Sequence, residues 1–327
     1  MNVASRTCLA VWASWACACA AQEPSAAPSP ASFAYVLQAE NLGETRAAAV
    51  DRLARCGRDW LVLDLVYAEG ADGAWTRAEL DALRAAQPGR KVLAYLSIGE
   101  AEDYRPYWRR AWDANRDGRP DPGAPKWLGE QNPEWKGNYK VRYWQEAWQQ
   151  LALRGVDEAA ARGFDGIYLD LVDAFETFEY DPSRKAWIDD RTNPETGRTY
   201  RQDMAAWVGT IAARARQAKP GCLVVPQNGS QLLRQAGYVA QVDAIGIEDL
   251  FTEGNKSQPA EHSDGILGDL KEMAAAHKPV LVIEYGSKEK ARARSRRACR
   301  ESGFTLLLTD RALKTLGESG AANEPKE

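Results

Sequence analysis

The sequence predicts an α/β protein built as a (β/α)8 barrel, and three observations lead to this fold class. Eight apolar segments resemble strands, and helix-like segments follow most of them. The strand segments are runs of valine, isoleucine and leucine, as expected for a parallel sheet covered on both faces. A chain of 327 residues has room for eight such units. A doubly wound open sheet is the alternative, but no G-x-G-x-x-G or Walker sequence follows any strand segment.

The eight predicted strands end in polar residues. The strands are expected at 33–38, 60–65, 91–98, 166–170, 222–226, 244–248, 280–285 and 304–309, with helices at 44–56, 77–86, 146–162, 202–218, 266–276, 288–299 and 311–316. In a barrel the C-terminal ends of parallel strands share one face, which is where active sites lie. The polar residues expected there are Gln38, Asp64, Glu100, Asp170, Gln227, Asn228, Glu248, Glu284, Tyr285 and Asp310.

The N-terminal segment differs from the rest of the chain. Arg6 precedes a weakly polar run that ends in small residues around 18–21, which is typical of a secretory signal peptide. Such a run is too short to span a bilayer. We therefore expect a signal peptide at 1–21, a flexible lead-in at 22–31, the barrel at 32–317 and a disordered tail at 318–327, in a secreted or periplasmic protein without a membrane span.

The amino-acid composition limits the binding partners and the kinds of catalysis that the sequence can support. The formal net charge of -4 is too small to indicate a nucleic-acid partner, although it leaves room for a cationic substrate. His262 and His277 are the only histidines and neither ends a strand, so we expect no Ser-His catalysis, no His-rich metal site and no cofactor. Carboxylates must then supply the acid and base. Nothing in the sequence predicts an oligomer, and we expect a monomer.

Three cysteines follow the signal segment, at Cys56, Cys222 and Cys299, without metal-ligand spacing. We prefer to interpret them as buried small hydrophobic residues. The alternative is one disulfide with one free thiol.

A long insertion from about 101 to 143 follows the third predicted strand. Six of the twelve tryptophans lie in it or at its exit: Trp108, Trp112, Trp127, Trp135, Trp144 and Trp148. Long loops at the catalytic end of a barrel are commonly functional, so these rings could stack on sugars. The alternative for any single tryptophan is packing in a small satellite core. A second insertion, 174–200, carries further aromatic residues.

Part of the first insertion has the spacing of a calcium loop. Asp113, Asn115, Asp117 and Asp121 follow the D-x-N-x-D-G pattern, but Ala124 occupies the position of the bidentate glutamate. A structural calcium site is one interpretation, and an acid-lined turn without metal is the other.

The C-terminal ends of two predicted strands give the strongest indication of catalytic residues. The segment 163–173 ends with Asp170 and Asp173, and the segment 242–249 ends with Glu248. A barrel with facing carboxylates and aromatic loops is typical of glycoside hydrolysis, which needs one protonated carboxyl and one carboxylate. Crowded negative charge raises the pKa of one member and keeps it protonated. Asp165 precedes its strand, so we expect it at the opposite end of the barrel in a structural role.

Five motifs occur together and in order, and as a set they resemble glycoside hydrolase family 114, the endo-α-1,4-polygalactosaminidases. They are Tyr95–Glu102, Asn132–Tyr139, Gly163–Asp173, Gln227–Gly229 and Ile247–Phe251, and the resemblance covers about 33–315.

The resemblance implies a barrel that cuts α-1,4-linked galactosamine or N-acetylgalactosamine polymers, such as galactosaminogalactan, in microbial exopolysaccharide and biofilm matrix. It places the catalytic acids at Asp170, here assigned as the nucleophile, and Glu248, here assigned as the acid/base. From their positions, the substrate contacts expected are Asp64, Glu100, Asp173, Asn228, Glu284, Tyr285, Trp135 and Tyr139. Deacetylated substrate would be cationic, which suits an acidic site.

Two other functions remain open on the sequence alone. One is a barrel that binds carbohydrate without turnover, which the presence of both acids disfavours. The other is a glycosidase acting on a different amino-sugar polymer.

Overall fold

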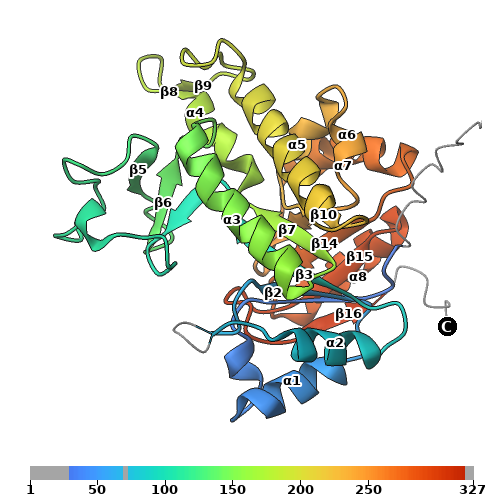
Figure 1. Ribbon diagram of the computed structural model, residues 1–327. Helices are drawn as coiled ribbons and strands as arrows, with labels where there is room; N and C mark the ends of the chain where they lie inside the picture. Colours follow the sequence, from blue (N-terminus) through green and yellow to red (C-terminus); the bar gives the residue numbers. More distant parts are fainter. Residues whose placement is uncertain (1–28, 69–72, 321–327) are drawn as a thin grey trace, which may run out of the picture.

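The computed structural model describes residues 29–68 and 73–320, and it confirms the (β/α)8 barrel (Figure 1). The predicted signal peptide, most of the lead-in and residues 321–327 lie outside the described residues. No helix among those that are described is long and apolar enough to cross a membrane.

Eight parallel strands form the barrel wall. Five make one continuous ladder in the order β1, β2, β3, β7, β10, and the remaining three follow in the order β11, β14, β15. Their bounds are β1 Phe33–Val36, β2 Trp60–Asp64, β3 Lys91–Ser97, β7 Gly166–Asp170, β10 Leu223–Pro226, β11 Ile245–Glu248, β14 Val280–Glu284 and β15 Thr305–Leu308.

Two seams join these ladders into a barrel. At the first, a parallel bridge between Gln227 and Gly246 connects the end of β10 to β11. At the second, the short strand β16 (Glu318–Gly320) pairs antiparallel with β15, and the Ser319 hydroxyl accepts a hydrogen bond from the Phe33 amide of β1.

Helices cover the outside of the wall (Figure 1). They are α1 Arg46–Ala54, α2 Arg77–Ala85, α3 Glu146–Arg162, α4 Phe175–Glu179, α5 Tyr200–Ala218, α6 Tyr238–Gln241, α7 Ala260–Ala275 and α8 Glu289–Ser302. Local sequence explains several helix ends. Thr76 and Thr199 begin α2 and α5 with capping boxes, while Gly163 and Gly303 end α3 and α8 in the left-handed conformation.

The insertions form small sheets of their own. The first carries β4 (Glu100–Glu102), β5 (Leu128–Gln131) and β6 (Asn138–Val141), ordered β4, β6, β5, with the 3-10 turn η2 (Arg110–Trp112) between β4 and β5. The second carries the hairpin of β8 (Tyr180–Asp181) and β9 (Ala186–Trp187). A third hairpin joins β12 (Thr252–Glu253) to β13 (Lys256–Ser257). Three more 3-10 turns are η1 (Ala39–Leu42), η3 (Val172–Ala174) and η4 (Ser230–Arg234).

Two apolar cores follow from the alternation of side chains along the strands. Inward-facing residues such as Phe33, Tyr35, Val62, Leu93 and Tyr168 fill the barrel. Outward-facing residues pack against the helices in a larger core, which continues into the first insertion. The wall is therefore buried on both sides, as the continuous apolar strands predict.

Two sequence predictions near the C-terminus differ from the structure. The helix predicted at 311–316 is absent, because the Asp310 carboxylate accepts hydrogen bonds from the amides of Lys314 and Thr315 and holds a turn. Leu313 then adopts a left-handed φ of 52° and packs into the inner core. Residues 318–320, placed in the tail by the sequence analysis, form β16.

The three described cysteines are free thiols, and Cys222 and Cys299 are buried. This agrees with their interpretation as small hydrophobic residues. Burial raises the pKa of the Cys222 thiol to about 11, which makes it a poor nucleophile.

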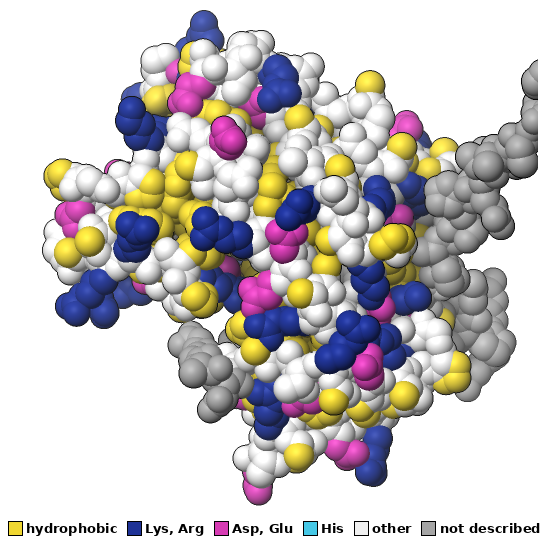
Figure 2. All heavy atoms as spheres, in the orientation of Figure 1, with side chains coloured by type: hydrophobic (Ala, Val, Ile, Leu, Met, Phe, Trp, Pro, Cys, Tyr) yellow, Lys and Arg dark blue, Asp and Glu magenta, His cyan; other side chains and the backbone are white. Residues whose placement is uncertain are grey.

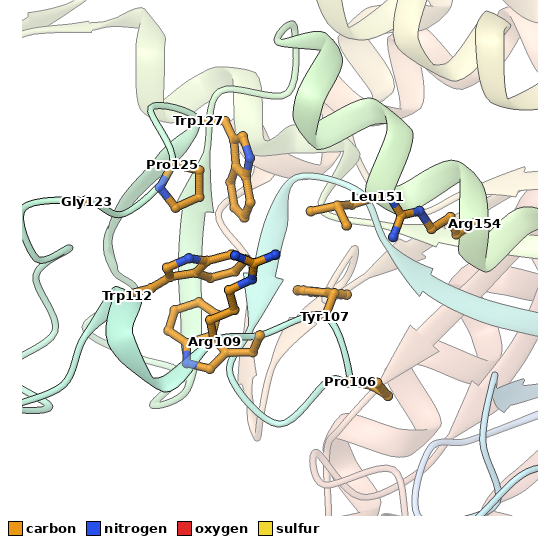
Figure 3. A pocket seen from close by; sticks show the side chains of 10 residues that line it. Pro106, Tyr107, Arg109, Trp112, Gly123, Pro125, Trp127, Leu151 and Arg154 are labelled. Carbon is orange, nitrogen blue, oxygen red and sulfur yellow. The ribbon is translucent and has the colours of Figure 1, made fainter.

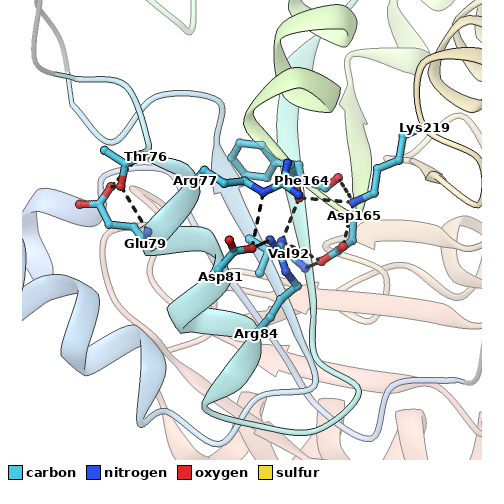
Figure 4. Close-up of polar contacts among 10 residues, drawn as sticks. Thr76, Arg77, Glu79, Asp81, Arg84, Val92, Phe164, Asp165 and Lys219 are labelled. Carbon is cyan, nitrogen blue, oxygen red and sulfur yellow. Dashed lines mark hydrogen bonds and ion pairs between the residues drawn. The ribbon is translucent and has the colours of Figure 1, made fainter.

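Asp165 directly precedes β7, so it lies at the opposite end of that strand from Asp170. Figure 4 shows its contacts. Its carboxylate accepts hydrogen bonds from the Val92 amide at 3.0 Å and from Lys219 Nζ at 2.9 Å, with Arg84 at 3.4 Å. Lys219 also donates to the Phe164 carbonyl at 2.6 Å. These contacts join β3, β7 and the helices α2 and α5, which is a structural role.

We expect Asp165→Ala to lower the free energy of unfolding by about 2–4 kcal/mol, because it leaves Lys219 and the Val92 amide without their shared acceptor. Urea unfolding measures this change. Asp157→Ala is the matched control, since that carboxylate pairs with Arg214 at an exposed site and should contribute little. Equal losses from the two substitutions would contradict the structural role of Asp165.

Candidate active site

Asp170 ends β7 and is held from both neighbouring strands. Its Oδ2 accepts a hydrogen bond from the Tyr95 hydroxyl of β3 at 2.7 Å. Its Oδ1 accepts one from Gln227 Nε2, just past β10, at 3.0 Å and one from the Leu171 amide at 2.7 Å. Three donors therefore orient one carboxylate, and all three stabilise its charged form.

Glu248 ends β11 and has a different set of neighbours. The Tyr285 hydroxyl, just past β14, donates to its Oε1. The Arg311 guanidinium lies over the Tyr285 ring, 4.1 Å from the centroid, and also pairs with Asp249. The Glu248 amide donates to Asn228 Oδ1 at 3.0 Å, which ties the end of β11 to the end of β10.

The two carboxylates differ from ordinary surface acids. Burial raises the pKa of Glu248 to about 7, and the negative charge of Asp170 adds to this effect, while Tyr285 and Arg311 oppose it. Burial also raises the pKa of Asp170, although the hydrogen bonds from Tyr95 and the Leu171 amide lower it. Because the charge of one acid acts on the other, Asp170 and Glu248 form one electrostatic site.

The backbone bends sharply after three strands of this site. Leu171, Asn228 and Asp249 each follow the end of a barrel strand and have φ values of 58°, 59° and 49°. This left-handed conformation is uncommon outside glycine, and least unfavourable for Asn and Asp. For Leu171 the conformation costs about 1–3 kcal/mol. Strained residues of this kind cluster at functional sites, and here they flank the acids and Gln227.

Two further acids belong to the same cluster. Asp173 follows in the turn η3, and burial together with the charges of Asp170, Glu176 and Glu248 raises its pKa to about 8. Glu100 is buried at the start of β4. Its Oε1 accepts a hydrogen bond from Asn132 Nδ2 at 3.0 Å, whereas its Oε2 has no partner among the described residues.

Several polar atoms around the acids are buried without a hydrogen-bond partner in the described part of the chain. They include Glu100 Oε2, Gln227 Oε1, Asp249 Oδ1 and the Tyr168 hydroxyl. Tyr168 fits only because Gly246 opposite has no side chain, since a Cβ there would lie 1.9 Å from the tyrosine oxygen. Unpaired buried polar atoms are rare in proteins. Their concentration here indicates a place where a polar ligand completes the hydrogen bonding.

Of the predicted substrate contacts, three form polar contacts within the protein and a fourth is exposed. Asp64 forms a two-pronged ion pair with Arg105 at 2.7 and 2.8 Å. Glu284 is fully buried and accepts hydrogen bonds from Phe251 and Thr252. Tyr139 is 2% exposed and donates to Asp113. These three carboxylate or hydroxyl groups are used within the protein, whereas Trp135 is 51% exposed.

The sequence analysis did not select Tyr95 or Arg311 as site residues. A signal for Tyr95 existed, because the alternation along β3 points it into the barrel with Leu93, where a hydroxyl needs a polar partner. Arg311 could not be found in this way, since it was assigned to a helix that does not form.

The candidate calcium loop uses its oxygens locally. Asp113 accepts hydrogen bonds from the amides of Asp117 and Gly118, and Asp121 accepts one from the Ala114 amide. Among the described residues no group of three or more His, Cys, Asp or Glu side chains could hold a metal ion. These contacts are those of an acid-lined turn, and a calcium site there stays a prediction.

The sequence matches a family model and several uncharacterized proteins. The model described as glycoside hydrolase family GH114 matches residues 16–324. The chain is 36% identical over 243 residues to an uncharacterized protein of Deinococcus radiodurans, an alignment covering 74% of this chain and 70% of that protein. It is 31% identical over 257 residues to an uncharacterized protein of Methanocaldococcus jannaschii, covering 77% and 66% respectively.

Solved structures share the fold. The glycoside hydrolase domain of PelA from Pseudomonas aeruginosa superposes with a TM-score of 0.63 at 19% identity, covering 89% of this chain and 99% of that one. Aspergillus fumigatus Ega3, solved in complex with galactosamine, gives a TM-score of 0.57 at 17% identity, with coverage of 81% and 89%.

We expect Tyr285→Phe to raise the pKa of Glu248 further, because the hydroxyl hydrogen bond favours the charged carboxylate. Carbon-13 NMR titration of the glutamate side-chain carboxyls measures this shift directly. Tyr238→Phe is the matched control, since that buried hydroxyl contacts neither acid. An unchanged or lowered Glu248 pKa in Tyr285→Phe would contradict the conclusion that the Tyr285 hydroxyl stabilises the charged form of Glu248.

Proposed function

Because the chain belongs to glycoside hydrolase family GH114, we propose that it cleaves α-1,4-linked galactosamine-containing polymers within the chain, with Asp170 and Glu248 as the catalytic pair. The observation that carries the proposal is the coupling of these two acids at the strand ends of a glycoside hydrolase barrel. The galactosamine bound to Ega3, a structure of the same fold, supports the choice of sugar.

The surroundings of each acid favour a different role. Three hydrogen-bond donors stabilise Asp170 as a carboxylate, which suits the nucleophile that attacks the anomeric carbon. The raised pKa of Glu248 keeps part of the population protonated near neutral pH, which suits the acid that protonates the departing oxygen. Glu248 then activates the water that releases the glycosyl-enzyme intermediate. These roles imply that the anomeric configuration is retained.

Cationic substrate also suits the electrostatics. Asp170, Asp173, Glu100 and Glu248 bring negative charge together, and burial raises the pKa of each. An ammonium group of a deacetylated galactosamine unit would lower those pKa values and recover part of the desolvation cost. The unpaired Glu100 Oε2 is the contact we assign to such an ammonium group. A polymer of this kind is extracellular, which fits the signal peptide predicted from the sequence.

We expect Asp170→Asn and Glu248→Gln each to lower kcat by roughly 10²–10⁴-fold on defined galactosamine oligomers, because each removes a group needed in the transition state. Chromatography of the products measures both rate and product length. Glu253→Gln is the matched control at an exposed position. Undiminished cleavage in either active-site variant would remove that residue from the chemistry. Binding without cleavage by the parent would favour a carbohydrate-binding barrel.

We expect kcat/KM to fall as pH rises through about 7, because Glu248 loses the proton that it must deliver. It should also fall at acidic pH, as Asp170 becomes protonated and loses its nucleophilicity. Profiles on N-acetylated and on deacetylated oligomers should be compared, since only the deacetylated ones carry amines that titrate in the same range. An activity that stays constant well above pH 8 would contradict the assignment of Glu248 as the acid.

A further inference from the structure

A second candidate site lies away from the acids, between the first insertion and α3. A cavity of about 530 Å³ opens there, and its walls include Tyr107, Trp108, Arg109, Trp112, Trp127 and Arg154. Figure 3 shows the rings of Trp112, Trp127 and Tyr107 around one hollow, with Arg109 and Arg154 beside it. In Figure 2 hydrophobic side chains gather on this flank of the molecule, with basic side chains next to them. We call this cavity the aromatic groove.

The floor of the aromatic groove is rigid. Trp112 packs edge-on against both Trp108 and Trp127, with ring centroids 5.2 and 5.3 Å apart. Trp127 packs in turn on Trp148 of α3 at 5.1 Å. Trp112 is 9% exposed and Trp127 3%, so packing determines the orientation of both rings. These two buried rings support Tyr107 and Trp108, which are half-buried and supply the aromatic surface that a ligand can reach. The packing behind them limits how far they reorder, which reduces the entropic cost of binding.

The charged side chains of the groove have one sign. Arg109 and Arg154 are both exposed, and neither guanidinium makes a hydrogen bond or ion pair with a described residue. Among the described residues that line the cavity there is no Asp or Glu. Arg105, only four residues from Arg109, is by contrast saturated by Asp64 and Glu102. Free guanidinium groups in a groove without carboxylates favour an anionic ligand, and bind carboxylates in a two-pronged geometry.

We propose that the aromatic groove is a second carbohydrate-binding site, specific for an acidic glycan whose sugar rings carry carboxylates. The apolar face of a pyranose ring packs on the half-buried rings of Trp108 and Tyr107, and ring carboxylates pair with Arg109 and Arg154. A cationic galactosamine polymer is repelled by the same arginines, so this ligand differs in charge from the substrate proposed for the barrel. The volume lies within the range of small-molecule pockets and accommodates a short stretch of sugar chain.

A sugar fits the groove better than an acidic peptide does. The aromatic surface that stays accessible belongs to the half-buried rings of Tyr107 and Trp108, and flat aromatic surfaces match the axial C–H face of a pyranose. The groove also lies outside the barrel, between the first insertion and α3.

Binding of galacturonic acid oligomers to the full chain tests the proposal, followed by tryptophan fluorescence and calorimetry. We expect saturable binding that weakens as salt rises, because screening reduces the charge interaction. The double variant Arg109→Ala, Arg154→Ala should bind at least about tenfold more weakly. Arg110→Ala is the matched control, since Arg110 is exposed next to Arg109 but does not line the groove. Glu248→Gln should bind like the parent.

Three further comparisons make the outcome decisive. Methyl-esterified oligomers, which lack the carboxylates, should bind at least about tenfold more weakly, and poly-glutamate should not compete. Equal binding of the ester, competition by poly-glutamate, an unchanged affinity in the double variant or absence of saturable binding would each overturn the proposal. The double variant should still cleave galactosamine oligomers at the parental rate, which separates this test from that of the proposed function.

Discussion

The register between β3 and β7 is the constraint on which the active site depends. Tyr95 pairs with Tyr168 and Ser97 with Asp170, so the Tyr95 hydroxyl reaches the Asp170 carboxylate at 2.7 Å from the neighbouring strand. A slip of one residue would turn every side chain of β7 to the other face of the wall. At the other end of β7 the same register is tied by Asp165, whose carboxylate accepts a hydrogen bond from the Val92 amide of β3 and whose amide donates to the Val92 carbonyl. Stability at one end of the barrel thus determines chemistry at the other.

The active site lowers the free energy of unfolding of the protein, and the structure shows the physical reason. Burial raises the pKa of Asp170, Asp173 and Glu248, which means that each charged form is destabilised in the folded state. Because these pKa values exceed those of the unfolded chain, the stability that these groups contribute is lost as pH rises through their folded values. The left-handed backbone at Leu171 adds strain. The two apolar cores on either side of the strands offset these terms.

Much of this arrangement could be predicted from the sequence, because it depends on local pattern. Continuous apolar strands predicted the barrel, and an acid directly after such a strand predicted the positions of Asp170 and Glu248. The helix predicted at 311–316 was wrong because the Asp310 carboxylate, directly before it, accepts hydrogen bonds from the Lys314 and Thr315 amides and holds a turn. The Tyr139 hydroxyl donates to Asp113, a partner that no local pattern indicates, and the predicted role of Tyr139 in binding substrate stays a prediction.

Charge is distributed unevenly over this molecule, and the formal net charge of -4 conceals the distribution. Carboxylates gather at the strand ends, whereas the charged side chains among the described residues of the aromatic groove are arginines. An acidic glycan and an amino-sugar polymer attract each other in a mixed matrix, because their charges are opposite. A protein with both sites would be retained by the first polymer while it cuts the second.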